Sequence, residues 1–185
     1  ETKPLIKNQH WPSAVLQARA LYQAKSYKQA KKMLEDMITE QENHLSLMSY
    51  GQAYKTLSDI YMREGNKDKA LELLEKAVSK VTLNHVYAKQ LGDFFLADKN
   101  YTKATQYYSL ARNIQSENID YAIEYGQVLR LSGKAKEAVE VLKPIITKAP
   151  NREDGVLAYA KSRIDLNQFE EVQSYLSNVI KTNPG

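Results

Sequence analysis

Cysteine is absent from this chain of 185 residues, which holds only 7 glycines and 5 prolines. The lack of cysteine excludes disulfides, thiolate zinc ligands and a cysteine nucleophile. So little glycine and proline argues against a disordered or loop-rich chain. No apolar run reaches the roughly 18 residues of a membrane-spanning helix, and alternating β-branched runs, which would indicate strands, are nearly absent.

Recognisable catalytic patterns are missing as well. The histidines, His10, His44 and His85, lie far apart in the sequence, which disfavours a shared metal site. The chain has no glycine-rich phosphate loop and no Ser or Thr spaced with a histidine as a nucleophile. We therefore expect no enzymatic activity, no cofactor and no metal ion.

The chain does carry apolar residues at helical spacing almost throughout, with breaks where turn residues cluster. The pattern predicts about ten helices in five antiparallel pairs. Their expected spans are residues 12–24, 27–41, 44–64, 67–81, 85–97, 101–114, 119–131, 135–148, 153–165 and 169–182. Pro144 lies inside one of them, so we expect a bend there.

A ladder of small residues runs along the second helix of each expected pair. Ala70, Ala104, Ala138 and Val172 are spaced 34 residues apart, and Ala30 lies 40 residues before Ala70. A fixed period of this length indicates an array of repeats. Each unit alone leaves an apolar face exposed, so stacking on its neighbours must stabilise it.

These residues resemble the tetratricopeptide repeat. The third unit shows the pattern most clearly, with Ala88, Leu91, Gly92, Phe95, Ala104, Tyr108 and Ala111. The resemblance implies an all-α fold, an α-solenoid in which five helix-turn-helix units form a right-handed superhelix. We expect an N-terminal leader at residues 1–10, followed by an array at residues 11–185. Its units are expected at about residues 11–44, 45–84, 85–118, 119–152 and 153–185.

Several departures from the family pattern are informative. Arg163 stands where a core aromatic residue is usual, and Val172 stands where alanine is usual. Six extra residues near His44 to Tyr50 are expected to lengthen the third helix. No polar capping helix follows the fifth unit, so we expect a fragment of a larger protein. Self-association, in which that unit stacks on another protomer, is a second hypothesis.

In this family the first helix of each pair lines a concave groove that binds peptides. Transferring its positions gives the expected peptide-binding residues: Arg19, Tyr22, Lys55, Asp59, Arg63, Lys89, Asp93, Leu96, Ile123, Gln127, Arg130, Leu157, Lys161 and Ile164. Across all groove positions six basic and six acidic residues cancel, so the net charge of +4 lies elsewhere. This argues against nucleic acid in the groove, because phosphate contacts need basic side chains.

Two features of the groove leave alternatives open. Lys55 and Lys89 each have an aspartate four residues on, which fits either simple pairing on the helix surface or a charged peptide-binding strip. Asp59 also argues against a lysine clamp for a peptide carboxylate. The apolar groove positions, Leu96, Ile123, Leu157 and Ile164, would bind a partner segment or pack on neighbouring helices.

The leading hypothesis is a non-enzymatic scaffold or adaptor that holds a peptide or helix of another protein in its groove. The alternative is an accessory or self-assembly domain of a larger envelope, secretion or polysaccharide-export machine, or of an enzyme. The absence of cysteine and of an initiating methionine favours an exported bacterial protein over a cytoplasmic one.

Overall fold

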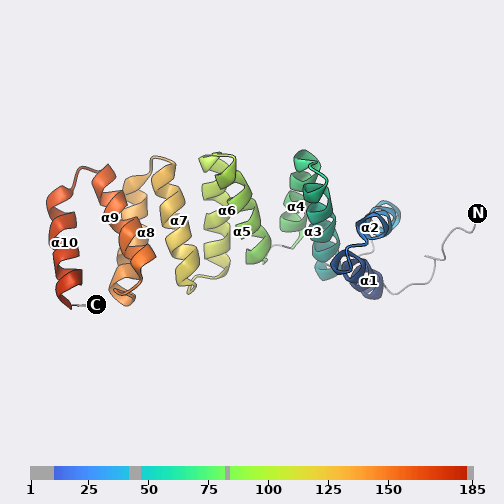
Figure 1. The fold of residues 1–185 in the computed structure, drawn as a ribbon, viewed down its shortest axis with the longest axis horizontal. Helices are drawn as coiled ribbons and strands as arrows, with labels where there is room; N and C mark the ends of the chain where they lie inside the picture. The colour runs from blue at the N-terminus through green and yellow to red at the C-terminus, as the bar shows by residue number, and fades with distance from the viewer. Residues whose placement is uncertain (1–10, 42–46, 82–83, 183–185) are drawn as a thin grey trace, which may run out of the picture. The chain divides into compact units, whose positions relative to one another are not determined.

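The computed structural model of the chain describes residues 11–41, 47–81 and 84–182, and these segments are helices joined by short turns (Figure 1). The helices are α1 Trp11–Gln23, α2 Tyr27–Gln41, α3 Leu47–Arg63, α4 Lys67–Lys80, α5 His85–Ala97, α6 Tyr101–Ile114, α7 Ile119–Leu131, α8 Ala135–Lys148, α9 Glu153–Asp165 and α10 Phe169–Thr182. This confirms the predicted all-α fold. The expected leader and the expected start of the third helix at residue 44 lie outside the described residues.

Each helical pair is closed by the same kind of turn. One residue per turn has a positive φ, at 62° for Lys25, 80° for Gly65, 57° for Lys99, 81° for Gly133 and 59° for Asn167. The next N–H donates to a carbonyl five residues back, as from Asn100 to Phe95 at 2.8 Å. This is the Schellman motif, which ends a helix with one left-handed residue. The left-handed residues share the spacing of the small-residue ladder, so the backbone repeats with the sequence.

Asparagines begin four of the helices. The side chains of Asn66 and Asn100 accept hydrogen bonds from backbone N–H groups three residues on, each at 3.2 Å. Asn84 and Asn118 do the same at the starts of α5 and α7. The first backbone N–H groups of a helix have no partner within the helix. An asparagine in this position accepts a hydrogen bond from one or two of them and stabilises the helix by about 1 kcal/mol.

The small residues lie where helices approach closely. In the ladder, Ala30, Ala70, Ala104 and Ala138 are fully buried, and Val172 is 7% exposed. On the first helices, a Cβ atom added at Gly126 would lie 2.6 Å from Cγ of Leu142, and one added at Gly92 would lie 2.9 Å from the Tyr108 ring. Both distances are shorter than van der Waals contact, so the packing of each pair requires a small residue there.

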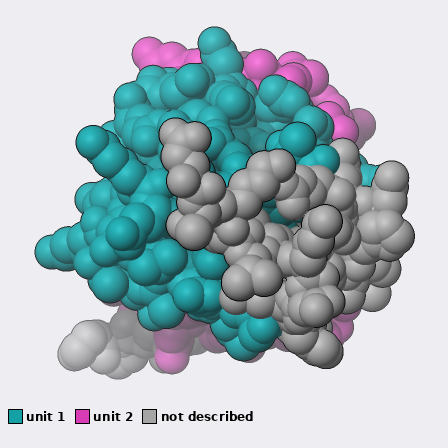
Figure 2. Space-filling view, turned by 90° about the vertical axis from the view of Figure 1, so that its right-hand side faces the viewer, with its two compact units in different colours: residues 1–87 teal, residues 88–185 magenta. Residues whose placement is uncertain are grey.

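The chain divides into two compact units, residues 1–87 and residues 88–185 (Figure 2). Within unit 1, α1 packs on α2 and on α3, and α3 packs on α4. Within unit 2, α7 packs on α8 and on α9, and α9 packs on α10. A first helix therefore contacts both its own partner and the first helix of the next pair, as stacked hairpins do. The division into five repeat units and the handedness of the array stay predictions.

The structure bears on three of the features that the sequence singled out: Arg163, the length of α3 and Pro144. Arg163 donates to the hydroxyl of Tyr159 at 2.7 Å and to the amide oxygen of Gln168 at 3.2 Å, so it ties α9 to the following turn. Helix α3 has 17 residues where α1 has 13, in line with a lengthened third helix. Helix α8 continues through Pro144, and the bend expected there stays a prediction.

Candidate functional site

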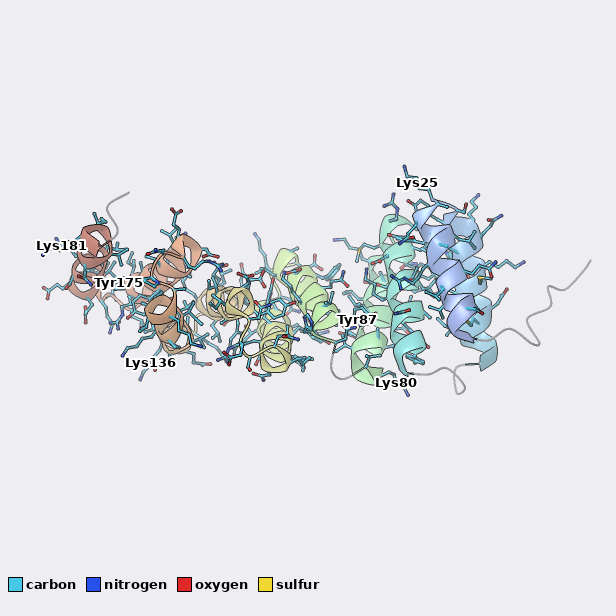
Figure 3. All side chains as sticks on the ribbon, turned by 90° about the horizontal axis from the view of Figure 1, so that it is seen from below. Lys25, Lys80, Tyr87, Lys136, Tyr175 and Lys181 are labelled. Atoms are coloured by element: carbon cyan, nitrogen blue, oxygen red, sulfur yellow. The ribbon has the colours of Figure 1, made fainter. Side chains whose placement is uncertain are left out.

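Unit 1 contains a pocket of about 280 Å³ between the first helices of its pairs. Helices α1 and α3 supply most of its wall, and Tyr87 from the first turn of α5 (labelled in Figure 3) completes it. The lining residues are Arg19, Tyr22, Gln23, Gln52, Lys55, Thr56, Asp59 and Tyr87. Four of the predicted groove residues, Arg19, Tyr22, Lys55 and Asp59, thus share one pocket.

Helical spacing explains why these side chains converge. Gln52, Lys55 and Asp59 are three and four residues apart, so they lie on one face of α3, and Arg19 and Tyr22 lie on one face of α1. The Thr56 hydroxyl on the same face donates to the carbonyl of Gln52 at 2.8 Å. That hydroxyl is satisfied within its own helix, so Thr56 contributes mainly shape to the pocket wall.

The pocket carries an excess of one positive charge. The Lys55 ammonium contacts the Asp59 carboxylate one turn along α3 in a half-buried ion pair. Arg19 is half-buried, and it has no ion-pair partner among the residues that the structure describes. Lys55 is therefore neutralised by its neighbour, and Arg19 supplies the unbalanced charge.

The two tyrosines of the pocket keep their protons. Burial raises the pKa of Tyr22, and the nearby Asp59 carboxylate raises it further. Burial also raises the pKa of Tyr87. Both hydroxyls are therefore neutral at physiological pH and can donate hydrogen bonds.

Arg63, another predicted groove residue, lies at the edge of this region. Its guanidinium stacks 4.6 Å from the ring centroid of Tyr27, and that ring makes an edge contact of 5.4 Å with Tyr22. The cation–π contact holds Arg63 beside the Tyr22 side of the pocket, where it is still exposed.

Unit 2 holds a separate charged cluster on α5 and α7. The Lys89 ammonium lies 2.9 Å from an oxygen of Asp93 and 3.1 Å from one of Glu124, and the Tyr108 hydroxyl donates to Asp93. Burial raises the pKa of Glu124 against the opposing effect of Lys89. The predicted residues Lys89 and Asp93 are therefore joined to a second helix and to a core tyrosine, beyond simple pairing along one helix.

The apolar groove prediction is wrong for Ile123. This side chain is only 2% exposed, and it packs in the core between α7, α8 and α9, close to Gly155. Helix α9 covers it, with Gly155 facing the tip of the Ile123 side chain. Leu157 and Ile164 on α9 are 54% and 43% exposed, and Leu96 is half-buried.

The remaining predicted residues lie on α7 and α9. Gln127 and Lys161 are exposed, and Arg130 forms an ion pair with Asp165 at 3.1 Å that joins the two helices. Sequence reasoning missed Tyr87 as a groove residue, because it lies off the expected stripe of α5. The sequence feature that could have pointed to Tyr87 is its position three residues after Asn84, whose side chain accepts a hydrogen bond from the Tyr87 N–H at the start of α5.

No group of three or more His, Asp or Glu side chains is placed to hold a metal ion within the described ranges. None of the helices in those ranges is long and apolar enough to cross a membrane.

Residues 47–79, which form α3 and most of α4, match the family model for the tetratricopeptide repeat. The chain has the tetratricopeptide-repeat fold. No curated protein sequence matches it significantly.

Solved structures agree with the fold along nearly the whole chain. MamA from AMB-1 is 20% identical with a TM-score of 0.69, and the match covers 95% of this chain and 92% of that one. YrrB, described as a TPR protein with an unusual peptide-binding site, is 16% identical with a TM-score of 0.72, covering 92% and 85%. A putative kinesin light chain of Podospora anserina with nearly identical TPR-like repeats is 19% identical with a TM-score of 0.62, covering 96% and 100%.

Proposed function

We propose that this chain is a non-enzymatic interaction domain, and that the pocket of unit 1 anchors an extended segment of a partner protein. The observation that carries the proposal is the pocket itself, because it lies on the first helices of its pairs and combines polar side chains with two aromatic rings. A concave site with a few convergent polar groups is the usual form of a binding site.

The fold supports a protein partner. Tetratricopeptide-repeat arrays present the first helices of their pairs to ligands, and YrrB is described as having a peptide-binding site. The pocket of about 280 Å³ is close to the lower limit of about 300 Å³ for small-molecule sites, so it has room for one or two side chains. A peptide that inserts a side chain here would lie along α1 and α3.

The test begins with a random peptide library displayed against the purified chain. Selected peptides are labelled, and their affinity is measured by fluorescence anisotropy for the wild type and for Gln52→Trp. The tryptophan would occupy the pocket from the half-buried position of Gln52, so we expect at least a tenfold loss of affinity. Far-UV circular dichroism of each variant reports whether the helices remain intact.

A control variant replaces a residue of unit 2 that does not line the pocket. Lys136 is exposed on α8 in unit 2 (Figure 3), and Lys136→Ala should bind the peptide as the wild type does. A library that yields no binding peptide would contradict the proposal. A peptide whose affinity is unchanged by Gln52→Trp would show that this pocket is not the binding site.

A further inference from the structure

Not every charged side chain in the unit 1 pocket has an ion-pair partner among the described residues. Three charged side chains line it, Arg19, Lys55 and Asp59, and the last two form an ion pair with each other. Arg63 nearby is held over the ring of Tyr27. Arg19 is thus the pocket-lining cation with no carboxylate to pair with among the described residues, although it is half-buried. A partly desolvated guanidinium without a counter-charge is a site for an anion.

The neutral groups of the pocket can also donate hydrogen bonds to an anion. The amide groups of Gln23 and Gln52 and the hydroxyls of Tyr22 and Tyr87 are all able to donate hydrogen bonds. The Thr56 hydroxyl is already engaged with the carbonyl of Gln52, and the carboxylate of Asp59 with Lys55. The amides and tyrosine hydroxyls that remain available to a ligand can donate as well as accept hydrogen bonds, so they can bind an acceptor with several oxygens.

The size and walls of the pocket narrow the choice of anion. Tyr22 and Tyr87 provide ring faces that suit the methylene groups of a side chain, while Arg19 provides the planar fork that binds a carboxylate through two hydrogen bonds. Lys55 is a poorer candidate for this role, because Asp59 already neutralises it and repels a second carboxylate.

We propose that the pocket takes an acidic side chain, Asp or Glu, of the bound segment, with the Arg19 guanidinium as its ion-pair partner. This specificity rests on the proposed function, since it assumes that a peptide occupies the pocket. It adds the chemical class of the anchoring residue and the side chain that selects it.

The test compares three peptide arrays that differ at one fixed central residue: glutamate, glutamine or phosphoserine. The best glutamate peptide and its glutamine counterpart are then titrated against the wild type, Arg19→Gln, Arg19→Lys and Gln52→Trp. A hydrogen-bonded ion pair that is partly desolvated contributes about tenfold to a hundredfold in affinity. We expect the glutamate peptide to bind the wild type at least tenfold more tightly than the glutamine peptide.

Arg19→Gln should remove that difference, because both peptides would then bind with the weaker affinity. Arg19→Lys should retain part of it, and Lys136→Ala, which removes an equal charge from unit 2, should retain all of it. The preference should also shrink as salt concentration rises, since the guanidinium is only half-buried.

The outcomes separate this inference from the proposed function. If Gln52→Trp weakens both peptides while Arg19→Gln leaves the glutamate preference intact, peptides bind the pocket and the role of Arg19 is wrong. If only phosphoserine peptides bind, the pocket takes a phosphate and the proposed carboxylate is wrong. If Gln52→Trp weakens neither peptide, both proposals fail together.

Discussion

Replacing Gly126 with alanine tests the close packing that the repeat requires. An added Cβ would lie 2.6, 2.8 and 2.9 Å from three atoms of Leu142, whose side chain is fully buried. Overpacking of this kind costs about 1–3 kcal/mol. Alanine also gains about 1 kcal/mol over glycine inside a helix, so the net loss for Gly126→Ala is about 0–2 kcal/mol.

A matched glycine isolates the cost of the overlap. Gly155 lies near the start of α9, and a Cβ there would lie 3.3 Å from the tip of Ile123, which is a flexible side chain end. Gly155→Ala should therefore be neutral or stabilising. Urea unfolding followed by far-UV circular dichroism should place Gly126→Ala about 1–3 kcal/mol below Gly155→Ala in free energy of unfolding.

A double mutant identifies the partner. Leu142→Ala alone should cost about 2–5 kcal/mol, because it leaves a cavity in the core of unit 2. In the Gly126→Ala background it should cost less, since the new methyl group occupies part of that space; we expect a coupling of about 1 kcal/mol. The packing argument would be refuted if Gly126→Ala and Gly155→Ala were equally stable. It would also be refuted if the costs of Gly126→Ala and Leu142→Ala were strictly additive in the double mutant.

Three further predictions follow from the polar groups and the turns. Tyr108→Phe removes the hydrogen bond to Asp93 and should lower the free energy of unfolding by about 1.5–3 kcal/mol; a loss within error would count against that bond. Burial raises the pKa of Tyr87, Tyr108 and Tyr175 above the unfolded value of about 10, so their stabilising contribution is complete below that pH and is lost as the pH rises through the folded pKa values. Phenolate absorbance and loss of helix should then rise together in alkali, and phenolate formation near pH 10 with helices intact would contradict this reasoning. Lys99 has a left-handed backbone at φ 57°, which glycine adopts without steric strain, so Lys99→Gly should raise the free energy of unfolding, measured in urea, by about 1 kcal/mol. Gly133→Ala should lower it, because alanine is strained at that left-handed position.

Much of the fold could be predicted because local and tertiary signals coincide. The ladder at Ala70, Ala104 and Ala138 marks the close helix contacts, and the turn residues at Gly65 and Gly133 mark the left-handed ends. Observed helix boundaries differ from the predicted ones by at most one residue, apart from the start of α3. The turns at Lys25 and Lys99 show that a left-handed residue need not be glycine, so composition alone would have missed them.

The site was harder to predict, because it depends on distances between helices. Helical spacing predicted that Arg19, Tyr22, Lys55 and Asp59 face the groove, and all four line the pocket. Ile123 occupies an equivalent predicted groove position on α7, yet α9 packs over it near Gly155 and buries it. Tyr87 joins the pocket from a neighbouring pair, which no spacing rule within one helix would indicate.

The central claim is that a peptide binds unit 1 between α1 and α3. Backbone amide NMR of the whole chain, recorded while a selected glutamate peptide is added, tests it most directly. We predict that the largest shift changes fall on Arg19, Gln52, Lys55 and Tyr87, and that Arg19→Gln reduces them at the same peptide concentration. Changes confined to α2 and α4, or to unit 2, would contradict the claim.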